Sequence, residues 1–115
     1  MQERRRYIRV ETPVLVEFAA PGSQEPEHTF TQDVSEEGVR FPTPAKLQVG
    51  QELVLGLKLP FDNATLRATG EVVWVREISR HGAPQYDVGV RFRWIEDPDR
   101  QQLLHHLTAL FSRRV

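Results

Sequence analysis

The chain of 115 residues is 39% hydrophobic and 27% charged, which fits one soluble globular domain and leaves too little material for a second stable core. Its net charge of -1 disfavours a general binder of nucleic acid, and the absence of cysteine excludes disulfides, thiolate zinc sites and cysteine nucleophiles. No apolar run is long enough to span a bilayer, and the charged N-terminus is unlike a signal peptide, so we expect a cytoplasmic protein without membrane insertion.

Residues 1–10 are predicted to form an arm that leads into the fold. The arginines of this arm are Arg4, Arg5, Arg6 and Arg9. Arginine carries a rigid planar fork that suits phosphate and guanine better than lysine does. Tyr7 and Ile8 are apolar and lie between the arginines, which favours a docked arm over a free basic tail.

Alternating apolar residues predict a barrel of short strands over residues 12–95. The alternation is clearest in residues 52–60, where four leucines share one face. Gly70 lies inside a later strand and predicts the bend or bulge that a closing sheet requires. The other predicted strands cover residues 12–20, 27–34, 39–41, 66–78 and 86–95.

Residues 97–112 are predicted to form a C-terminal helix. Asp97 can cap this helix, Pro98 suits its first position, and five apolar residues follow at helical spacing. The five are Leu103, Leu104, Leu107, Leu110 and Phe111. The sequence therefore predicts a mainly β protein, a six- to seven-stranded antiparallel β-barrel with one C-terminal α-helix, as a single domain of residues 1–115.

No set of residues indicates catalysis or metal binding. Ser35 lies near Asp33 in the sequence, but no histidine accompanies them to complete a nucleophilic site. His105 and His106 are adjacent and point to different sides of a helix, which makes a poor metal site. All four histidines are expected at the solvated surface, the other two being His28 and His81. We predict that the protein is not an enzyme and holds no metal or cofactor.

The turn at residues 33–38 carries groups that suit a nucleotide. Asp33 can accept hydrogen bonds from guanine N1 and N2, and the Ser35 hydroxyl can bond a base or a phosphate. Gly38 permits close approach of the backbone or a positive φ. Taken alone, the stretch is better explained as an ordinary strand–turn–strand in which Asp33 and Ser35 bond the local backbone.

The arginine motif and the turn motif, in this order, resemble those of the PilZ domain family. They are Arg5-x-x-x-Arg9 and, about two dozen residues later, Asp33-x-Ser35-x-x-Gly38. Residues 70–75 and 89–92 look like the later strand signatures of the family. The resemblance covers residues 3–110, and the motif residues do not depart from the family pattern.

The resemblance implies a small β-barrel receptor for cyclic di-GMP, a bacterial second messenger. In the family, the arginine motif grips guanine and phosphate, and the turn motif bonds the other guanine edges. The ligand-binding residues implied in this way are Arg4, Arg5, Arg6, Arg9, Asp33, Ser35 and Gly38. Trp74 matches a tryptophan that can pack against a base, and a core position is its alternative. Trp94 is expected in the core beneath the helix.

Our hypothesis for the mechanism is that the ligand orders the arm. Neighbouring arginines repel one another, and two phosphates would offset this repulsion and draw the arm onto the barrel. The ordered arm would change the surface shown to an unidentified protein effector, and the resemblance implies control of motility or biofilm formation. Family members bind one ligand or a stacked pair, and Arg4 favours the pair. The alternative function is a protein-interaction adaptor, for example in pilus or motility machinery, that acts without nucleotide.

Overall fold

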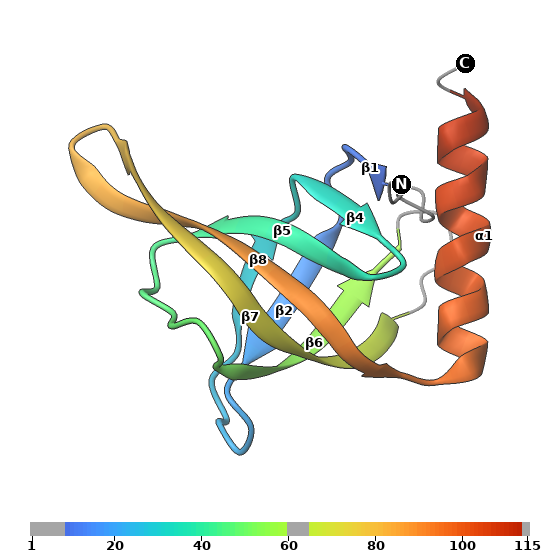
Figure 1. The fold of residues 1–115 in the computed structure, drawn as a ribbon, viewed down its shortest axis with the longest axis horizontal. Coiled ribbons are helices and arrows are strands. Elements are labelled where there is room, and N and C mark those ends of the chain that lie inside the picture. Colours follow the sequence, from blue (N-terminus) through green and yellow to red (C-terminus); the bar gives the residue numbers. More distant parts are fainter. Residues whose placement is uncertain (1–8, 60–64, 114–115) are drawn as a thin grey trace, which may run out of the picture.

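The computed structural model describes residues 9–59 and 65–113, and this part of the chain forms eight β-strands and one α-helix (Figure 1). Short strands come first, a long hairpin follows, and the helix is last. In chain order the elements are β1 (Arg9–Val10), β2 (Leu15–Ala19), β3 (Glu27–Phe30), β4 (Asp33–Ser35), β5 (Gly38–Thr43), β6 (Glu52–Lys58), β7 (Thr65–Arg80), β8 (Ala83–Ile95) and α1 (Asp97–Arg113).

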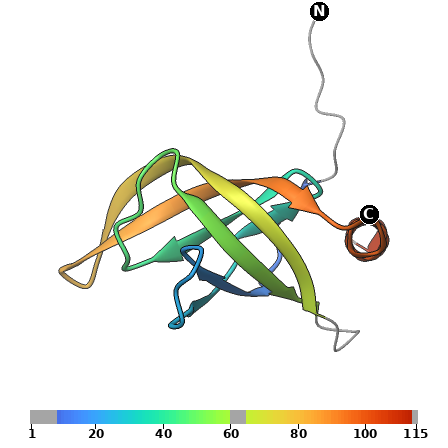
Figure 2. The same cartoon turned by 90° about the horizontal axis from the view of Figure 1, so that it is seen from below.

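The strands lie in one antiparallel sheet, in the order β1-β4-β5-β8-β7-β6-β2-β3. The sheet is strongly curved, so that its two ends turn toward each other (Figure 1, Figure 2). Near the end of the sheet, the Thr29 hydroxyl on β3 donates a hydrogen bond to the Pro42 carbonyl on β5, at 2.8 Å. The ladder of strand pairs itself is not closed, so the sheet has the shape of a barrel that remains open along one seam.

The predicted fold class, a mainly β antiparallel architecture with one C-terminal helix, is confirmed. The described residues form eight strands rather than six or seven. One extra strand arises because residues 27–34 divide into β3 and β4. Another arises because the end of the predicted arm pairs with β4 and becomes β1.

The core is filled by alternating apolar residues, because successive residues of a strand point to opposite faces of the sheet. On β6 the predicted leucine face is buried, and it lies beside the buried face of β2. The rings of Phe18 and Phe41 are 4.8 Å apart between centroids, which joins β2 to β5 across the interior. The buried residues of β2, β6 and their flanks are Val14, Val16, Phe18, Leu53, Leu55, Leu57 and Leu59.

Two irregularities in the β7–β8 pairing change which residues face the solvent. They fall between Thr69 and Gly70 and between Val72 and Trp74. Such a shift inverts the inward and outward alternation beyond it. Val72 is buried, whereas Trp74 is 38% exposed, so the core alternative for Trp74 is wrong. Trp94, expected in the core beneath the helix, is 54% exposed, and that expectation is also wrong.

Helix α1 packs near β1, β4 and β7 (Figure 1). Leu103 and Leu107 are buried as predicted, whereas Leu104 is partly exposed, and the side chain of Phe111 lies outside the described residues. His106, expected at the solvated surface, is buried because it follows Leu103 by three positions and shares its face of the helix. No helix in the described ranges is long and apolar enough to cross a membrane.

Candidate ligand-binding site

A shallow pocket of about 160 Å³ lies on the outer face of β5, β8 and β7, beside β1. Gly38 and Arg40 face outward here because their neighbour Val39 points into the core. Three arginines and one glutamate contribute to the wall, so the pocket has an excess of positive charge that suits an anionic ligand. The lining residues are Arg9, Glu37, Gly38, Val39, Arg40, Val73, Trp74, Gly89, Val90 and Arg91.

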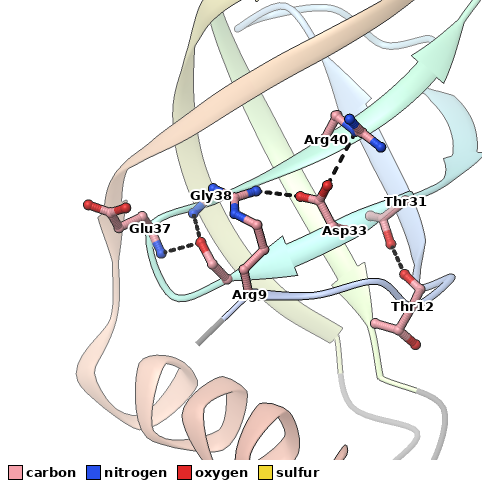
Figure 3. Close-up of polar contacts among 8 residues, drawn as sticks. Arg9, Thr12, Thr31, Asp33, Glu37, Gly38 and Arg40 are labelled. Atoms are coloured by element: carbon pink, nitrogen blue, oxygen red, sulfur yellow. Dashed lines mark hydrogen bonds and ion pairs between the residues drawn. The ribbon is translucent and has the colours of Figure 1, made fainter. Parts of the chain in front are cut away.

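Asp33 lies behind the pocket and holds two of its arginines. The carboxylate is on β4, and its side chain is only 8% exposed. Its Oδ1 accepts a hydrogen bond from Nη1 of Arg9 at 2.5 Å, and its Oδ2 lies 3.2 Å from Nε of Arg40 (Figure 3). Arg40 is the direct cross-strand partner of Asp33 in the β4–β5 pair. One buried carboxylate therefore orients two cationic side chains from separate strands.

The position of Arg9 depends on how β1 is fixed to the sheet. Arg9 pairs with Ser35 in the short β1–β4 ladder. Just beyond β1, the Thr31 hydroxyl donates to the Thr12 carbonyl at 2.6 Å (Figure 3). The same hydroxyl oxygen accepts from the Val14 amide at 2.9 Å. These bonds tie the segment between β1 and β2 to Thr31, one of the two residues that separate β3 from β4. They place the start of the described chain at the edge of the pocket.

Ser35 fixes the turn between β4 and β5. Its hydroxyl oxygen accepts from the backbone amides of Glu37, at 3.1 Å, and Gly38, at 3.3 Å (Figure 3). The residue is fully buried, and these bonds belong to a local turn of the kind that serine forms with amides two or three residues ahead. In this structure the serine shapes the backbone that borders the pocket.

Gly38 is required by a close approach of two strands. A Cβ atom at this position would lie 2.0 Å from the Val90 carbonyl oxygen, a distance that the backbone of β8 does not permit. Next to it, the Phe92 amide donates to the Glu37 carbonyl at 2.7 Å. The missing side chain therefore lets the turn lie directly against β8.

Trp74 forms one side of the pocket. The irregular register between Val72 and Trp74 places the indole opposite Gly89, and a Cβ atom at Gly89 would lie 2.2 Å from its Nε1. Gly89 thus leaves the space that the ring occupies. The exposed remainder of the indole offers a flat apolar surface beside the arginines, which is suitable for stacking on a base.

The structure brings together the described members of the predicted site. Arg9, Gly38 and Trp74 line the pocket, while Asp33 and Ser35 lie behind it and hold Arg9 and the turn. The other three predicted arginines, Arg4, Arg5 and Arg6, lie outside the described residues. The described ranges contain no group of three or more side chains placed to bind a metal ion.

Seven of the ten lining residues were not predicted as site residues, among them Arg40, Gly89 and Arg91. Arg40 and Arg91 look like ordinary outward residues of their strands, and Gly89 looks like a strand glycine. The hairpin spacing around residues 33–38 was a usable signal for Arg40, because a short turn places it opposite Asp33. Arg91 had no comparable signal, since its approach to Gly38 depends on the pairing of β5 with β8.

Comparison with protein families gives one match over most of the chain. The family model described as PilZ domain matches residues 3–109. The sequence matches none of the curated proteins searched.

Several solved structures share the fold at low sequence identity. The Bacillus subtilis inhibitor of motility, MotI/DgrA, has a TM-score of 0.79 and 20% identity, with 97% of this chain and 53% of that chain covered. The PilZ domain of YcgR from Escherichia coli, solved with c-di-GMP, has a TM-score of 0.70 and 16% identity, covering 97% and 94%. The K. pneumonia MrkH–c-di-GMP complex has a TM-score of 0.70 and 16% identity, covering 99% and 57%. The present chain thus spans about half the length of MotI/DgrA and MrkH.

Proposed function

Because the chain belongs to the PilZ domain family, we propose that it binds cyclic di-GMP in the pocket beside β1. The observation that carries this proposal is the exposed Trp74 indole beside arginine side chains on one concave surface. Aromatic faces stack on bases, and guanidinium groups pair with phosphates and with guanine edges. The solved complexes of YcgR and MrkH with c-di-GMP support this class of ligand.

Each residue of the pocket has a proposed role in holding the nucleotide. One guanine stacks on Trp74, and Arg9 and Arg91 bind phosphate oxygens or guanine edges. Gly38 lets the ligand approach the backbone of the turn, which Ser35 holds in shape. The cationic set is completed by the arginines of the preceding segment, Arg4, Arg5 and Arg6.

The proposed affinity follows from the number of charge-assisted contacts. Each one contributes about 1.5–3 kcal/mol. A few of them, less the cost of ordering long side chains, give a dissociation constant on the order of micromolar or tighter. We propose a binding role and not a catalytic one, with residues 1–115 acting as a single receptor domain.

Isothermal titration with cyclic di-GMP tests the proposal. The wild-type protein should bind saturably, and Arg9→Ala should weaken binding at least about ten-fold through loss of a charged contact. Arg93→Ala is the matched control, because Arg93 is an exposed arginine that pairs with a carboxylate, Glu71, and does not line the pocket. An equal loss of affinity in both variants contradicts the proposal. Absence of binding by the wild type also contradicts it and favours a nucleotide-independent adaptor.

Transmission to a protein effector is proposed to pass through the arm. Arg9 and Val10 already pair with β4. Binding of two phosphates would hold the rest of residues 3–10 against the sheet and alter the surface offered to the effector. Hydrogen exchange of these residues should slow when cyclic di-GMP is added. Unchanged exchange in residues 3–10, at a concentration where titration shows the site to be filled, would contradict this route of transmission.

A further inference from the structure

The buried carboxylate of Asp33 has two cationic partners, and they differ in how they are placed. Arg9 is at the start of β1, is 40% exposed along its side chain, and contacts Oδ1 through a terminal nitrogen. Arg40 lies inside the sheet on β5, is 32% exposed along its side chain, and faces Oδ2 with Nε. Figure 3 shows the two arginines approaching the carboxylate from different sides.

A buried carboxylate that loses its last partner is strongly disfavoured, because its charge is neither hydrated nor paired. Arg9 and Arg40 contact separate oxygens of the Asp33 carboxylate. When either arginine leaves, the other keeps the carboxylate paired, so this penalty does not arise. Arg9 is the more exposed of the two, and its contact uses the end of the side chain, so it can rotate toward a ligand. The Nε atom of Arg40 is buried and makes no hydrogen bond within the described residues, so its 3.2 Å contact with Oδ2 is an ion pair, and the carboxylate is the charged group that this buried atom faces.

We infer that Arg40 is a positioning residue that keeps Asp33 paired while Arg9 engages the nucleotide. This inference rests on the proposed function. In the structure both arginines share the carboxylate. In the complex Arg9 transfers its terminal nitrogens to a phosphate or guanine edge, and Arg40 retains Asp33. Arg40 thereby lowers the cost of releasing Arg9 without needing to touch the ligand.

A binding cycle separates this role from direct contact. In the wild-type background, Arg40→Ala should weaken cyclic di-GMP binding about ten-fold, because release of Arg9 then strands a buried charge. In an Asp33→Asn background, which keeps an acceptor oxygen but removes the charge, adding Arg40→Ala should have no further effect. Arg40→Lys should recover part of the affinity, since it restores a cation near the carboxylate. Equal weakening by Arg40→Ala in both backgrounds, or none in the wild type, would overturn the inference.

Thermal unfolding without nucleotide gives a second, independent test. Arg9→Ala and Arg40→Ala should each lower the melting temperature slightly, because one partner remains. The double variant should lower it by clearly more than the two single shifts together. Additive shifts would show that the arginines do not share Asp33 and would overturn the inference. If the wild type failed to bind cyclic di-GMP, the proposed function would fall, while this unfolding cycle would still decide whether the carboxylate is shared.

Discussion

The indole of Trp74 lies against the backbone of Gly89, in space that a Cβ atom at Gly89 would fill, 2.2 Å from Nε1 of the ring. The two residues face each other across the β7–β8 pair, directly after an irregularity in its register. The sheet thus places a large aromatic side chain against the one residue type that leaves room for it. Both residues line the pocket, and Gly89 leaves the space that the indole occupies there.

Gly89→Ala should displace the Trp74 ring and weaken ligand binding. The added methyl group cannot occupy the space of the indole, so the ring must move, at a cost of about 1–3 kcal/mol in the free energy of unfolding. Urea unfolding measures the stability, and titration with cyclic di-GMP measures the affinity. Trp74→Ala/Gly89→Ala serves as the control. If the ring is the reason for the loss, the Gly89 substitution should cost no further stability or affinity once Trp74 is absent.

Fluorescence of Trp74 should report a stacked guanine directly. The protein has two tryptophans, so Trp94→Phe leaves Trp74 as the single indole. Trp94 is exposed and does not line the pocket, which makes this background suitable. Cyclic di-GMP should quench the remaining emission saturably, because a base stacked on the ring offers a route for loss of the excited state. In the reverse background, Trp74→Phe, emission from Trp94 should stay constant, and quenching there would contradict the assignment.

Gly38→Ala should destabilise the fold more than an ordinary glycine substitution. The new Cβ atom would lie 2.0 Å from a backbone oxygen of β8, so two strands must separate, and we expect a loss of at least about 2 kcal/mol. Gly56→Ala is the matched control within the same sheet. Its Cβ atom would meet a Thr65 methyl group at 3.3 Å, and we expect a change below about 1 kcal/mol. Similar losses of unfolding free energy in the two variants would show that the close approach of the strands at Gly38 is not what makes its substitution costly.

Duplex DNA should not bind the protein saturably. The chain has a net charge of -1, and a general DNA binder needs many phosphate contacts. Fluorescence anisotropy of a labelled duplex at about 0.15 M salt, where surface charges are largely screened, should show no saturable binding. Tight binding that falls steeply as salt rises would contradict this prediction and identify nucleic acid as a partner.

Much of the fold was predictable, because apolar and polar residues alternate along a strand that buries one face and exposes the other. The leucines of β6 and the apolar face of β2 follow a strict period of two, and the structure buries them as predicted. Trp74 and Trp94 were harder to place, since each lies beyond a register shift that depends on the partner strand. Gly70 indicated an irregularity in β7, and one falls between Thr69 and Gly70. No pattern within either strand indicated the second shift or which side chains the two shifts turn outward.

The candidate site was only partly predictable for a similar reason. Asp33 and Ser35 were identified from their motif, and the strand–turn–strand alternative anticipated that Ser35 bonds the local backbone. The sequence did not indicate that Asp33 is shared between two arginines. Arg40 and Arg91 enter the pocket through cross-strand pairing. Strand pairing brings together residues that are distant along the chain, so the places of Arg40 and Arg91 in the pocket become visible only in the assembled sheet.

The most direct test of the account is an amide and indole N–H NMR titration of the whole chain with cyclic di-GMP. Shifts should concentrate on the Gly38 and Gly89 amides and on the Trp74 indole, which all border the pocket. Gly22 and Gly56 border a separate hollow between β2 and β6, and the chemical shifts of their amides should not change. Shifts confined to Gly22 and Gly56, or no shifts at saturating nucleotide, would contradict the claim that this pocket is the binding site.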